Sequence, residues 1–211
     1  MKSLLKNPKT ARIVAVAAAI ALMIAVVGGV WARYAREESF SGNVQFSASL
    51  ASELTLFEHR AVQNGLTGAY TLGAEIVSAN SYRLIPGYDV PKDPTVRVVG
   101  KTGIDAFLFV EAVGVPAGIT FSVTSDWMPL TVAGRQVWVF KGSTAAPVIL
   151  DESFGTAAKE IPVLDGNLLR VSQSIQSTAV QTLAFRAYLL QVPAGTAQSA
   201  EGAQAVFTTA V

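Results

Sequence analysis

The residues from Ser39 to Leu50, SFSGNVQFSASL, alternate strictly between two kinds of side chain. Serine, asparagine and glutamine fill one parity, and apolar residues with one glycine fill the other. The apolar members are Phe40, Val44, Phe46, Ala48 and Leu50. A period of two over twelve residues predicts a β-strand that is buried on one face only. The apolar face of such a strand needs a second layer to cover it.

Further short segments with strand-like composition follow at the spacing typical of a β-sandwich. Two of them, AFLFVEAV at 106–113 and TLAFRAYLLQV at 182–192, are apolar on both faces and are predicted to be central strands. Other strands are expected over 95–99, 119–127, 135–141 and 168–175, and a short amphipathic helix is expected within 194–211. The pattern predicts a single all-β domain over residues 33–211, with mostly antiparallel strands in two packed layers.

Residues 13–32 form an uncharged, apolar stretch of 20 residues, and four basic residues precede it. As a helix this stretch is about 30 Å long, the thickness of the hydrocarbon layer of a bilayer. Val30 and Ala32 are small residues at the −3 and −1 positions of a cut before Arg33, so residues 1–32 are predicted to be a signal peptide that is removed. A permanent membrane anchor is the alternative, because the apolar run exceeds the usual signal-peptide core of about 7–15 residues.

Charge and cysteine content limit the classes of partner and of stabilising bond that we expect for the exported chain. Without residues 1–32 it has 12 basic and 15 acidic residues and no basic run, which argues against nucleic acid as a partner. Contact with a membrane is expected only through residues 13–32. The chain has no cysteine, so neither disulfides nor a thiolate metal site are available.

The residue types needed for catalysis are scarce. His59 is the single histidine, and we expect it to be a solvated loop residue, because no second histidine or cysteine is present to complete a zinc site. No G-x-S-x-G nucleophile motif occurs. We therefore expect no catalytic, metal or cofactor site and no enzymatic activity. Trp127, beside Pro129, is either a core residue or a carbohydrate-stacking platform.

The segment YRLIPGYDVPKDPTVRVVG, residues 82–100, places prolines next to strand-forming residues. Proline cannot donate to a strand ladder, so we expect Pro86, Gly87, Pro91 and Pro94 to hold an exposed corner at the sheet rim. Such a corner would discourage pairing with stray strands. Residues 57–81 show no pattern that predicts a particular structure.

Four stretches of the chain resemble the TasA/camelysin family of exported Gram-positive proteins with SipW-type signal peptides, which includes biofilm-matrix fibre subunits. The leader end AVVGGVWARY and the first strand FSGNVQFSASLASE are similar to the family pattern. So are the block YRLIPGYDVPKDPTVRVVGKTGIDAFLFVEA and the late LAFRAYLLQV with its alanine-rich tail. The resemblance implies a jelly-roll-like β-sandwich that is secreted to the extracellular matrix or the cell surface and cut by a signal peptidase.

The resemblance also implies a mode of assembly. In fibre-forming members the mature N-terminal strand pairs with the sheet of the next subunit, so the partners here would be other copies of this chain. Other matrix or surface proteins are further partners. The alternative is that the strand completes its own sandwich and that the protein is a membrane-tethered monomeric binding or adhesion module. The metalloprotease activity associated with the family name is not expected, because no zinc ligand set is present.

Overall fold

The computed structural model describes residues 36–38, 43–46, 54–100, 105–151, 154–175, 180–181 and 183–211. For residues 36–38, 43–46, 99–100, 155–156 and 180–181 it describes the backbone alone. Regular structure in these ranges is almost entirely β-strand, which confirms the predicted all-β class. The strands are β1 (Arg36–Glu38), β2 (Asn43–Phe46), β3 (Leu54–Gln63), β4 (Tyr70–Val77), β5 (Tyr82–Arg83), β6 (Val90–Pro91), β7 (Thr95–Gly100), β8 (Ala106–Val113), β9 (Ile119–Thr120), β10 (Trp127–Val132), β11 (Arg135–Phe140), β12 (Ile149–Leu150), β13 (Gly155–Pro162), β14 (Leu168–Val171), β15 (Val180–Gln181) and β16 (Ala184–Gln191). A 3-10 turn, η3 (Asp165–Asn167), and the helix α2 (Ala200–Ala210) are the other described elements.

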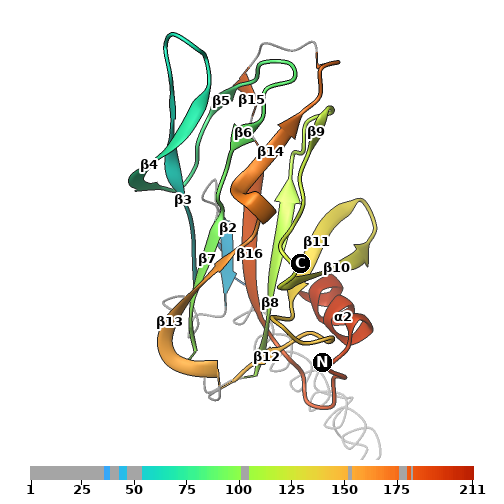
Figure 1. Ribbon diagram of the computed structural model, residues 1–211. Helices are drawn as coiled ribbons and strands as arrows, with labels where there is room; N and C mark the ends of the chain where they lie inside the picture. Colours follow the sequence, from blue (N-terminus) through green and yellow to red (C-terminus); the bar gives the residue numbers. More distant parts are fainter. Residues whose placement is uncertain are drawn as a thin grey trace, which may run out of the picture.

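The larger sheet has the strand order β1-β2-β16-β8-β11-β10, and β12 also pairs with β8. β16 and β8 are antiparallel over eight residue pairs and run side by side through the middle of the molecule (Figure 1). Alternate residues of β8 enter two different cores, with Leu108 and Val110 in one and Phe107 and Phe109 in the other. β16 divides in the same way, which confirms both predicted central strands.

The second sheet, with the order β13-β7-β3-β4, covers one face of the larger sheet. The two sheets share a core in which Leu56 of β3 and Val96 and Val98 of β7 pack with the first face of β8 and β16. Two short ladders, β6-β14-β9 and β15-β5, lie at the upper end in the view of Figure 1. Mostly antiparallel strands in two packed layers were predicted, and these two sheets with their shared core agree with that prediction.

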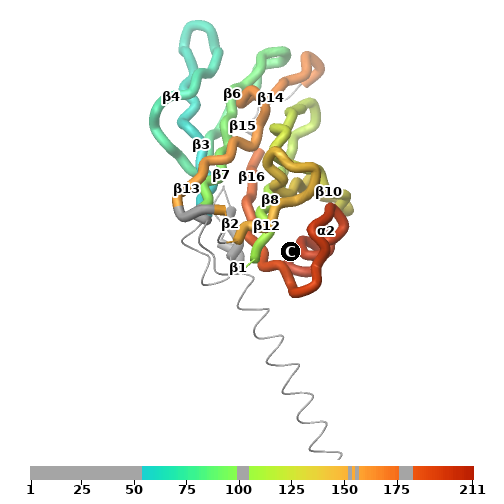
Figure 2. Tube along the Cα trace, turned by 60° about the horizontal axis from the view of Figure 1, so that its bottom comes forward, coloured from blue at the N-terminus to red at the C-terminus, as the bar shows by residue number. Residues whose placement is uncertain are grey.

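The helix α2 covers part of the other face of the larger sheet. Ser199 caps its N-terminus, because the side-chain oxygen accepts a hydrogen bond from Gly202 N at 3.2 Å. Phe207 is fully buried, and its ring lies 5.2 Å from that of Phe109 in a tilted arrangement and 5.3 Å from that of Tyr188 in a T-shaped one. Figure 2 shows α2 beside β10 at one end of the molecule. The helix expected within residues 194–211 is thus confirmed.

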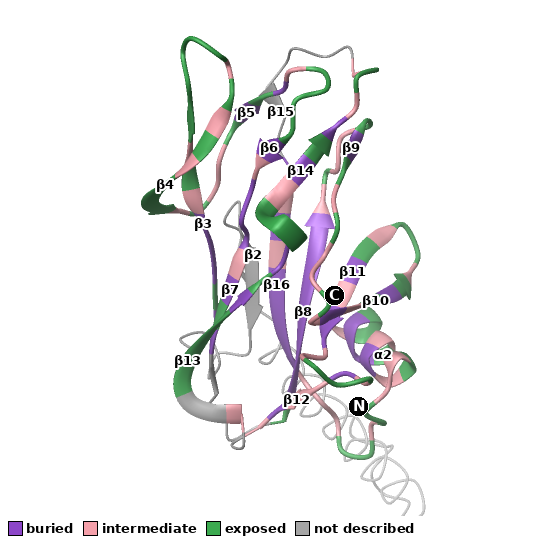
Figure 3. Ribbon diagram, in the orientation of Figure 1, coloured by how far each residue is buried: buried purple, intermediate pink, exposed green. Residues whose placement is uncertain are grey.

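Most of residues 57–81 form a β-hairpin of β3 and β4, which the sequence did not predict. Its turn is closed by a hydrogen bond from Asn64 N to Ala69 O at 2.8 Å. Gly68 adopts φ 74°, a left-handed conformation that favours glycine. The hairpin extends away from the two-layer body (Figure 1), and its tip is exposed (Figure 3), with Leu66 98% exposed.

Around β9, β10 and β11 the observed strands differ in part from those predicted. A turn at Ala133-Gly134 separates β10 from β11, so the strand expected over 135–141 begins where the sequence predicted. The strand expected over 119–127 is shorter, because only β9 is a ladder, and an isolated bridge at Val123 follows it. Trp127 therefore begins β10 instead of ending a strand.

The first half of the proline-rich segment behaves as expected. Pro86 and Gly87 are exposed and occupy the centre of a tight turn in which Tyr88 N donates to Ile85 O at 3.0 Å. Gly87 has φ 77°, as the third residue of a type II turn requires.

The second half of that segment is covered, so the expectation of an exposed rim is wrong for Pro94, which is buried. Pro91 is half-buried in β6 and pairs with Leu168 of β14. The carbonyl of Pro94 accepts a hydrogen bond from Val163 N at 2.9 Å. Pro91 and Pro94 were expected to leave this edge open, but other segments of the same chain, at Leu168 and Val163, pair with it.

The N-terminal predictions fall mostly outside the described residues. Residues 13–32, together with Val30, Ala32 and Arg33 of the predicted cleavage site, are among those not described. Within the described ranges, no helix combines the length and the apolar character that crossing a bilayer requires.

Candidate functional site

The predicted assembly strand corresponds in part to β2, at an outer position of the larger sheet. β2 pairs with β16 in parallel, and Val44 is in register with Ala187. Phe46 also lies in β2, whereas Phe40, Ala48 and Leu50 lie outside the described residues. Within this structure, therefore, the β2 segment is paired with the sheet of its own chain.

The attachment of β2 differs from that of the other strands. Its register with β16 covers three residue pairs, whereas β16 and β8 share eight. It is also the one parallel ladder among the strand pairs of the described ranges, and parallel pairing is slightly less stable per residue than antiparallel pairing. On its outer side β2 meets the three-residue strand β1. β2 is therefore held by ladders of three residue pairs on each side, next to the edge of the sheet.

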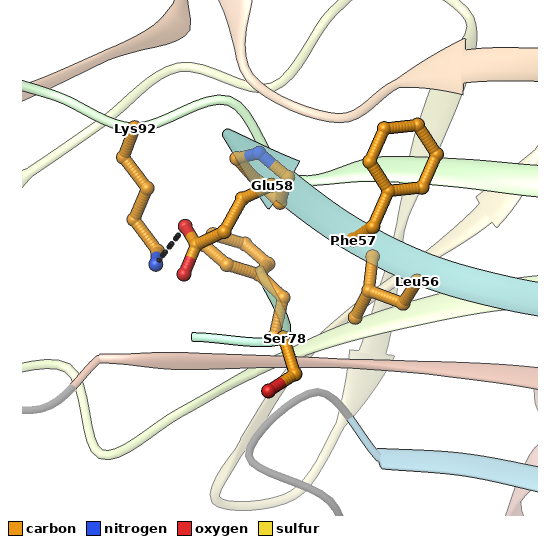
Figure 4. Close-up of a pocket in the computed structure, with 7 residues that line it drawn as sticks. Leu56, Phe57, Glu58, Ser78 and Lys92 are labelled. Carbon is orange, nitrogen blue, oxygen red and sulfur yellow. Dashed lines mark hydrogen bonds and ion pairs between the residues drawn. The ribbon is translucent and has the colours of Figure 1, made fainter. Parts of the chain in front are cut away.

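A buried ion pair lies at the second sheet (β13-β7-β3-β4, called the smaller sheet below), where β3 meets the segment between β6 and β7. Lys92 Nζ is 2.6 Å from Glu58 Oε2, and the two side chains are 4% and 5% exposed (Figure 4). Lysine and glutamate are rarely buried to this degree unless they are paired. The ion pair joins two segments that are 34 residues apart in the sequence.

Asn80 completes the environment of Glu58. Its backbone N–H donates to Glu58 Oε1 at 2.6 Å, so both oxygens of this carboxylate have partners. The Asn80 side chain donates to His59 O and accepts from Ala61 N, each at 2.8 Å. The β3–β4 register shifts between His59 and Ala61. At this irregularity the Asn80 amide makes the hydrogen bonds to His59 O and Ala61 N that a neighbouring strand would otherwise make.

His59 is not the solvated loop residue that the sequence predicted. It lies within β3, and its side chain is 37% exposed. Its Nδ1 is 2.5 Å from Asp93 Oδ2, and its backbone N–H donates to Asp93 Oδ1 at 2.9 Å. The Asp93 side chain is 8% exposed, so its two contacts with His59 compensate for its burial. This prediction failed because Asp93 lies 34 residues further along the chain.

Apolar groups enclose the Glu58–Lys92 pair. A cavity of about 10 Å³ adjoins it, lined also by Leu56, Phe57, Ser78, Pro94 and Phe185 (Figure 4). The centre of the Tyr82 ring lies 5.6 Å from Lys92 Nζ, and the hydroxyl of Tyr82 donates to Pro91 O at 3.0 Å. Burial, followed by the negative charges of Glu58 and Asp93, raises the pKa of Tyr82 well above its ordinary value. The charged groups of the pair are therefore almost completely removed from solvent.

A second buried carboxylate, Glu111 of β8, lies beneath α2. Arg135 donates to both of its oxygens, at 2.7 and 2.8 Å, and the hydroxyl of Tyr188 donates to Oε2 at 2.6 Å. The Arg135 guanidinium also stacks over the ring of Phe207 at 4.7 Å. Burial alone would raise the pKa of Glu111, but the hydrogen bonds from Arg135 and Tyr188 outweigh it and lower this pKa. The arrangement fixes α2 to the sheet.

A more open cavity of about 240 Å³ lies between β9 and the η3–β14 segment. Seven residues line it: Thr120, Phe121, Ser122, Asp165, Gly166, Leu168 and Arg170. The Arg170 side chain is 71% exposed, and its guanidinium donates to Asp89 at 3.0 Å. This volume is near the lower limit for small-molecule sites, about 300 Å³.

Trp127 does not form a carbohydrate-stacking platform. It is 4% exposed, and its indole N–H donates to Pro162 O at 3.0 Å. Its ring meets the edge of Phe140 with centroids 5.6 Å apart. The alternative of a core residue is the one that the structure confirms.

The described part of the chain was also compared with the geometry that a metal ion requires. Across residues 54–100 and the later described ranges, no three carboxylate or imidazole groups converge as a metal ion would require.

The buried ion pair was missed because Lys92 and Asp93 stand in a segment that we expected to be exposed. The signal that was available is the sequence VPKDP, in which two charged residues interrupt a strand-forming region between prolines.

Comparison with known proteins adds no relative. No protein-family model, no curated protein and no solved structure matches this chain.

Proposed function

We propose that this protein is a secreted structural protein, a subunit of a biofilm-matrix or cell-surface fibre that assembles through its N-terminal strand. The observation that carries the proposal is the parallel β2–β16 ladder of three residue pairs. A strand held near a sheet edge by so few pairs can be replaced by the same strand of a second copy, because every contact is reproduced between chains.

The place that β2 occupies supports this proposal. If β2 leaves, it exposes the edge of β16, a strand whose residues 187–190 are all buried. Such an edge readily accepts another strand. A donor strand from a second copy would cover it again and would link two subunits through main-chain hydrogen bonds. The jelly-roll-like topology, export by a cleaved leader and placement in the extracellular matrix belong to the same proposal and follow from the family resemblance.

Engineered cysteines test the exchange directly, because the chain has none of its own. Val44 and Ala187 are Cα partners, and neighbouring strands lie about 4.8 Å apart, a separation that a disulfide can bridge. Full-length Val44→Cys and Ala187→Cys proteins are mixed, concentrated and oxidised. We expect a covalent heterodimer that runs at twice the monomer mass without reductant.

The matched control mixes Val44→Cys with Leu66→Cys, whose cysteine is at the exposed tip of the hairpin. This mixture reports collision alone and should give little heterodimer. The double variant Val44→Cys/Ala187→Cys shows whether the strand pairs within one chain. An internal disulfide at every concentration, with no heterodimer in the first mixture, would contradict assembly by strand exchange.

The cavity of about 240 Å³ favours a second candidate, a monomeric surface-binding module. Asp165 and Arg170 supply charge and Phe121 supplies an aromatic ring, a combination that suits a small polar ligand such as a terminal sugar. Calorimetric titration with neutral and carboxylate-bearing oligosaccharides tests this function. Binding that is lost in Asp165→Asn, by a protein that stays monomeric in the cysteine experiment, would favour the module over the fibre subunit.

A further inference from the structure

We propose that Lys92 and Glu58 condense to form an amide, an intramolecular crosslink between β3 and the segment that leads into β7. The amine nitrogen and the carboxylate oxygen are already 2.6 Å apart in a site that is closed to solvent. This inference does not depend on fibre assembly. It assigns a covalent modification to a pair of residues that otherwise forms a buried ion pair.

Three features place the groups for reaction. The first is the approach of Lys92 Nζ to Glu58 Oε2, which brings the nitrogen near the carboxyl carbon. The second is the Asn80 N–H at 2.6 Å from Oε1, where negative charge develops as the nitrogen adds to that carbon. The third is the pair of hydrogen bonds between the Asn80 side chain and β3, one donated to His59 O and one accepted from Ala61 N, which holds this N–H in place.

The step balances without any co-reactant. A proton passes from Nζ to Oε2 along their hydrogen bond and leaves a neutral amine and a neutral acid. The lone pair of Nζ then forms the bond to the carboxyl carbon, and the bond from this carbon to Oε2 breaks. Oε2 takes a second proton from the nitrogen and leaves as water. An ammonium and a carboxylate thus become one amide and one water molecule, with no change of oxidation state.

The surroundings favour the amide over the ion pair. Separate charges are costly to bury, whereas an amide is neutral. The adjoining cavity of about 10 Å³ is close to the smallest volume that holds one water molecule, so the departing water has a place to go. Leu56, Phe57 and Phe185 keep other water away, which disfavours hydrolysis of the product.

Lys92 is distinctive among the cations that form ion pairs in the described residues. The others are His59 and the arginines Arg60, Arg97, Arg135 and Arg170. A guanidinium stays protonated and does not act as a nucleophile, whereas a lysine amine does once it has lost a proton. The geometry therefore points to Lys92 alone for this reaction.

Mass spectrometry of the purified full-length protein tests the crosslink. We expect the intact mass to be lower by one water molecule than the mass of the same chain uncondensed. After digestion, a branched peptide should join the fragment that contains Glu58 to the fragment that contains Lys92. Lys92→Arg is the matched control, because it keeps a positive charge and should show neither the mass loss nor the branched peptide.

A further variant distinguishes condensation from an unrelated dehydration. Glu58→Gln should lose ammonia instead of water when its amide carbon is attacked by the same amine. The wild-type peptide map is decisive even if both variants fold poorly. Unbranched peptides that carry free Lys92 and free Glu58, with an intact mass that stays unreduced after prolonged incubation of the folded protein, would overturn the proposal.

Discussion

Glu58 and Glu111 are buried to nearly the same extent, 4% and 5% exposed, but they meet different cations. Glu111 faces Arg135, whose side chain is 26% exposed at the rim beneath α2. Glu58 faces Lys92, whose side chain is 4% exposed within the smaller sheet. Equal burial of two carboxylates thus conceals two environments, one connected to solvent through its partner and one enclosed.

Because of this difference, the two buried ion pairs should differ in how well the cation compensates the carboxylate. The planar guanidinium of Arg135 binds both oxygens of Glu111 and remains partly hydrated, so the ion pair is a stable final state. The ammonium of Lys92 is a compact charge with little access to water. As long as Lys92 and Glu58 remain an ion pair, their pairing must offset the full cost of removing two ions from water, so substitutions should destabilise this site more than the Glu111 site.

The largest effect is expected from Lys92→Met. It leaves the Glu58 carboxylate buried without its cation and, relative to the chain in which the two side chains form an ion pair, such a change costs about 3–5 kcal/mol of the free energy of unfolding. Arg135→Met should cost less, about 1–3 kcal/mol, because Glu111 keeps its bond from Tyr188 and the opened rim admits water. Guanidinium chloride unfolding at pH 7 measures both. Equal losses would show that the two environments do not differ in energy.

A smaller change should follow when the stranded charge is removed. In Lys92→Met/Glu58→Gln the neutral amide oxygen still accepts the Asn80 N–H, and no ion is buried. We expect this double variant to recover about 1–3 kcal/mol relative to Lys92→Met. The same unfolding experiment measures it. A double variant no more stable than Lys92→Met would mean that lost packing, not the unpaired charge, dominates.

The pH dependence of stability should report Glu111. Its hydrogen bonds from Arg135 and Tyr188, aided by the nearby charge of Arg186, outweigh burial and hold its pKa below the ordinary 4.5. Its contribution to stability is therefore complete above pH 4.5 and is lost as the pH falls through the lower folded value.

Glu111→Gln should lower the free energy of unfolding at pH 7 by about 1–2 kcal/mol. It should also reduce the decline in stability between pH 5 and pH 3, which thermal unfolding at several pH values measures. An unchanged acid decline would show that other carboxylates govern this range.

The smallest effect is expected at an exposed ion pair, which sets the scale for the two buried ones. Arg97 and Glu160 join β7 to β13, and their side chains are 44% and 52% exposed. Glu160→Gln should change the free energy of unfolding by about 0–1 kcal/mol, and this change should disappear at high salt. A loss as large as that of Lys92→Met would remove burial as the explanation of the difference.

The parts of the fold that could be predicted are those whose burial is recorded locally in the sequence. β8 and β16 are apolar on both faces because a sheet covers one face and α2 covers part of the other. The turn at Pro86-Gly87 was also predictable, because proline and glycine at these two positions specify its conformation.

The hairpin and the buried polar cluster could not be predicted in this way. Gly65, Gly68 and Gly73 gave the hairpin the composition of a loop, although Gly73 lies within β4. The contacts of Glu58 and His59 with Lys92 and Asp93 join positions 34 residues apart, which no local periodicity encodes. The register shift that admits Asn80 likewise has no signature in the sequence.

The two-sided enclosure of β8 has a consequence for how the molecule opens. Its amides are bonded to strands on both sides and lie between two apolar cores, so they can reach solvent only when the larger sheet as a whole comes apart. Their deuterium uptake should be the slowest in the chain and should report global unfolding. Exchange at β2 and β4, each near the end of a sheet, should proceed by local opening.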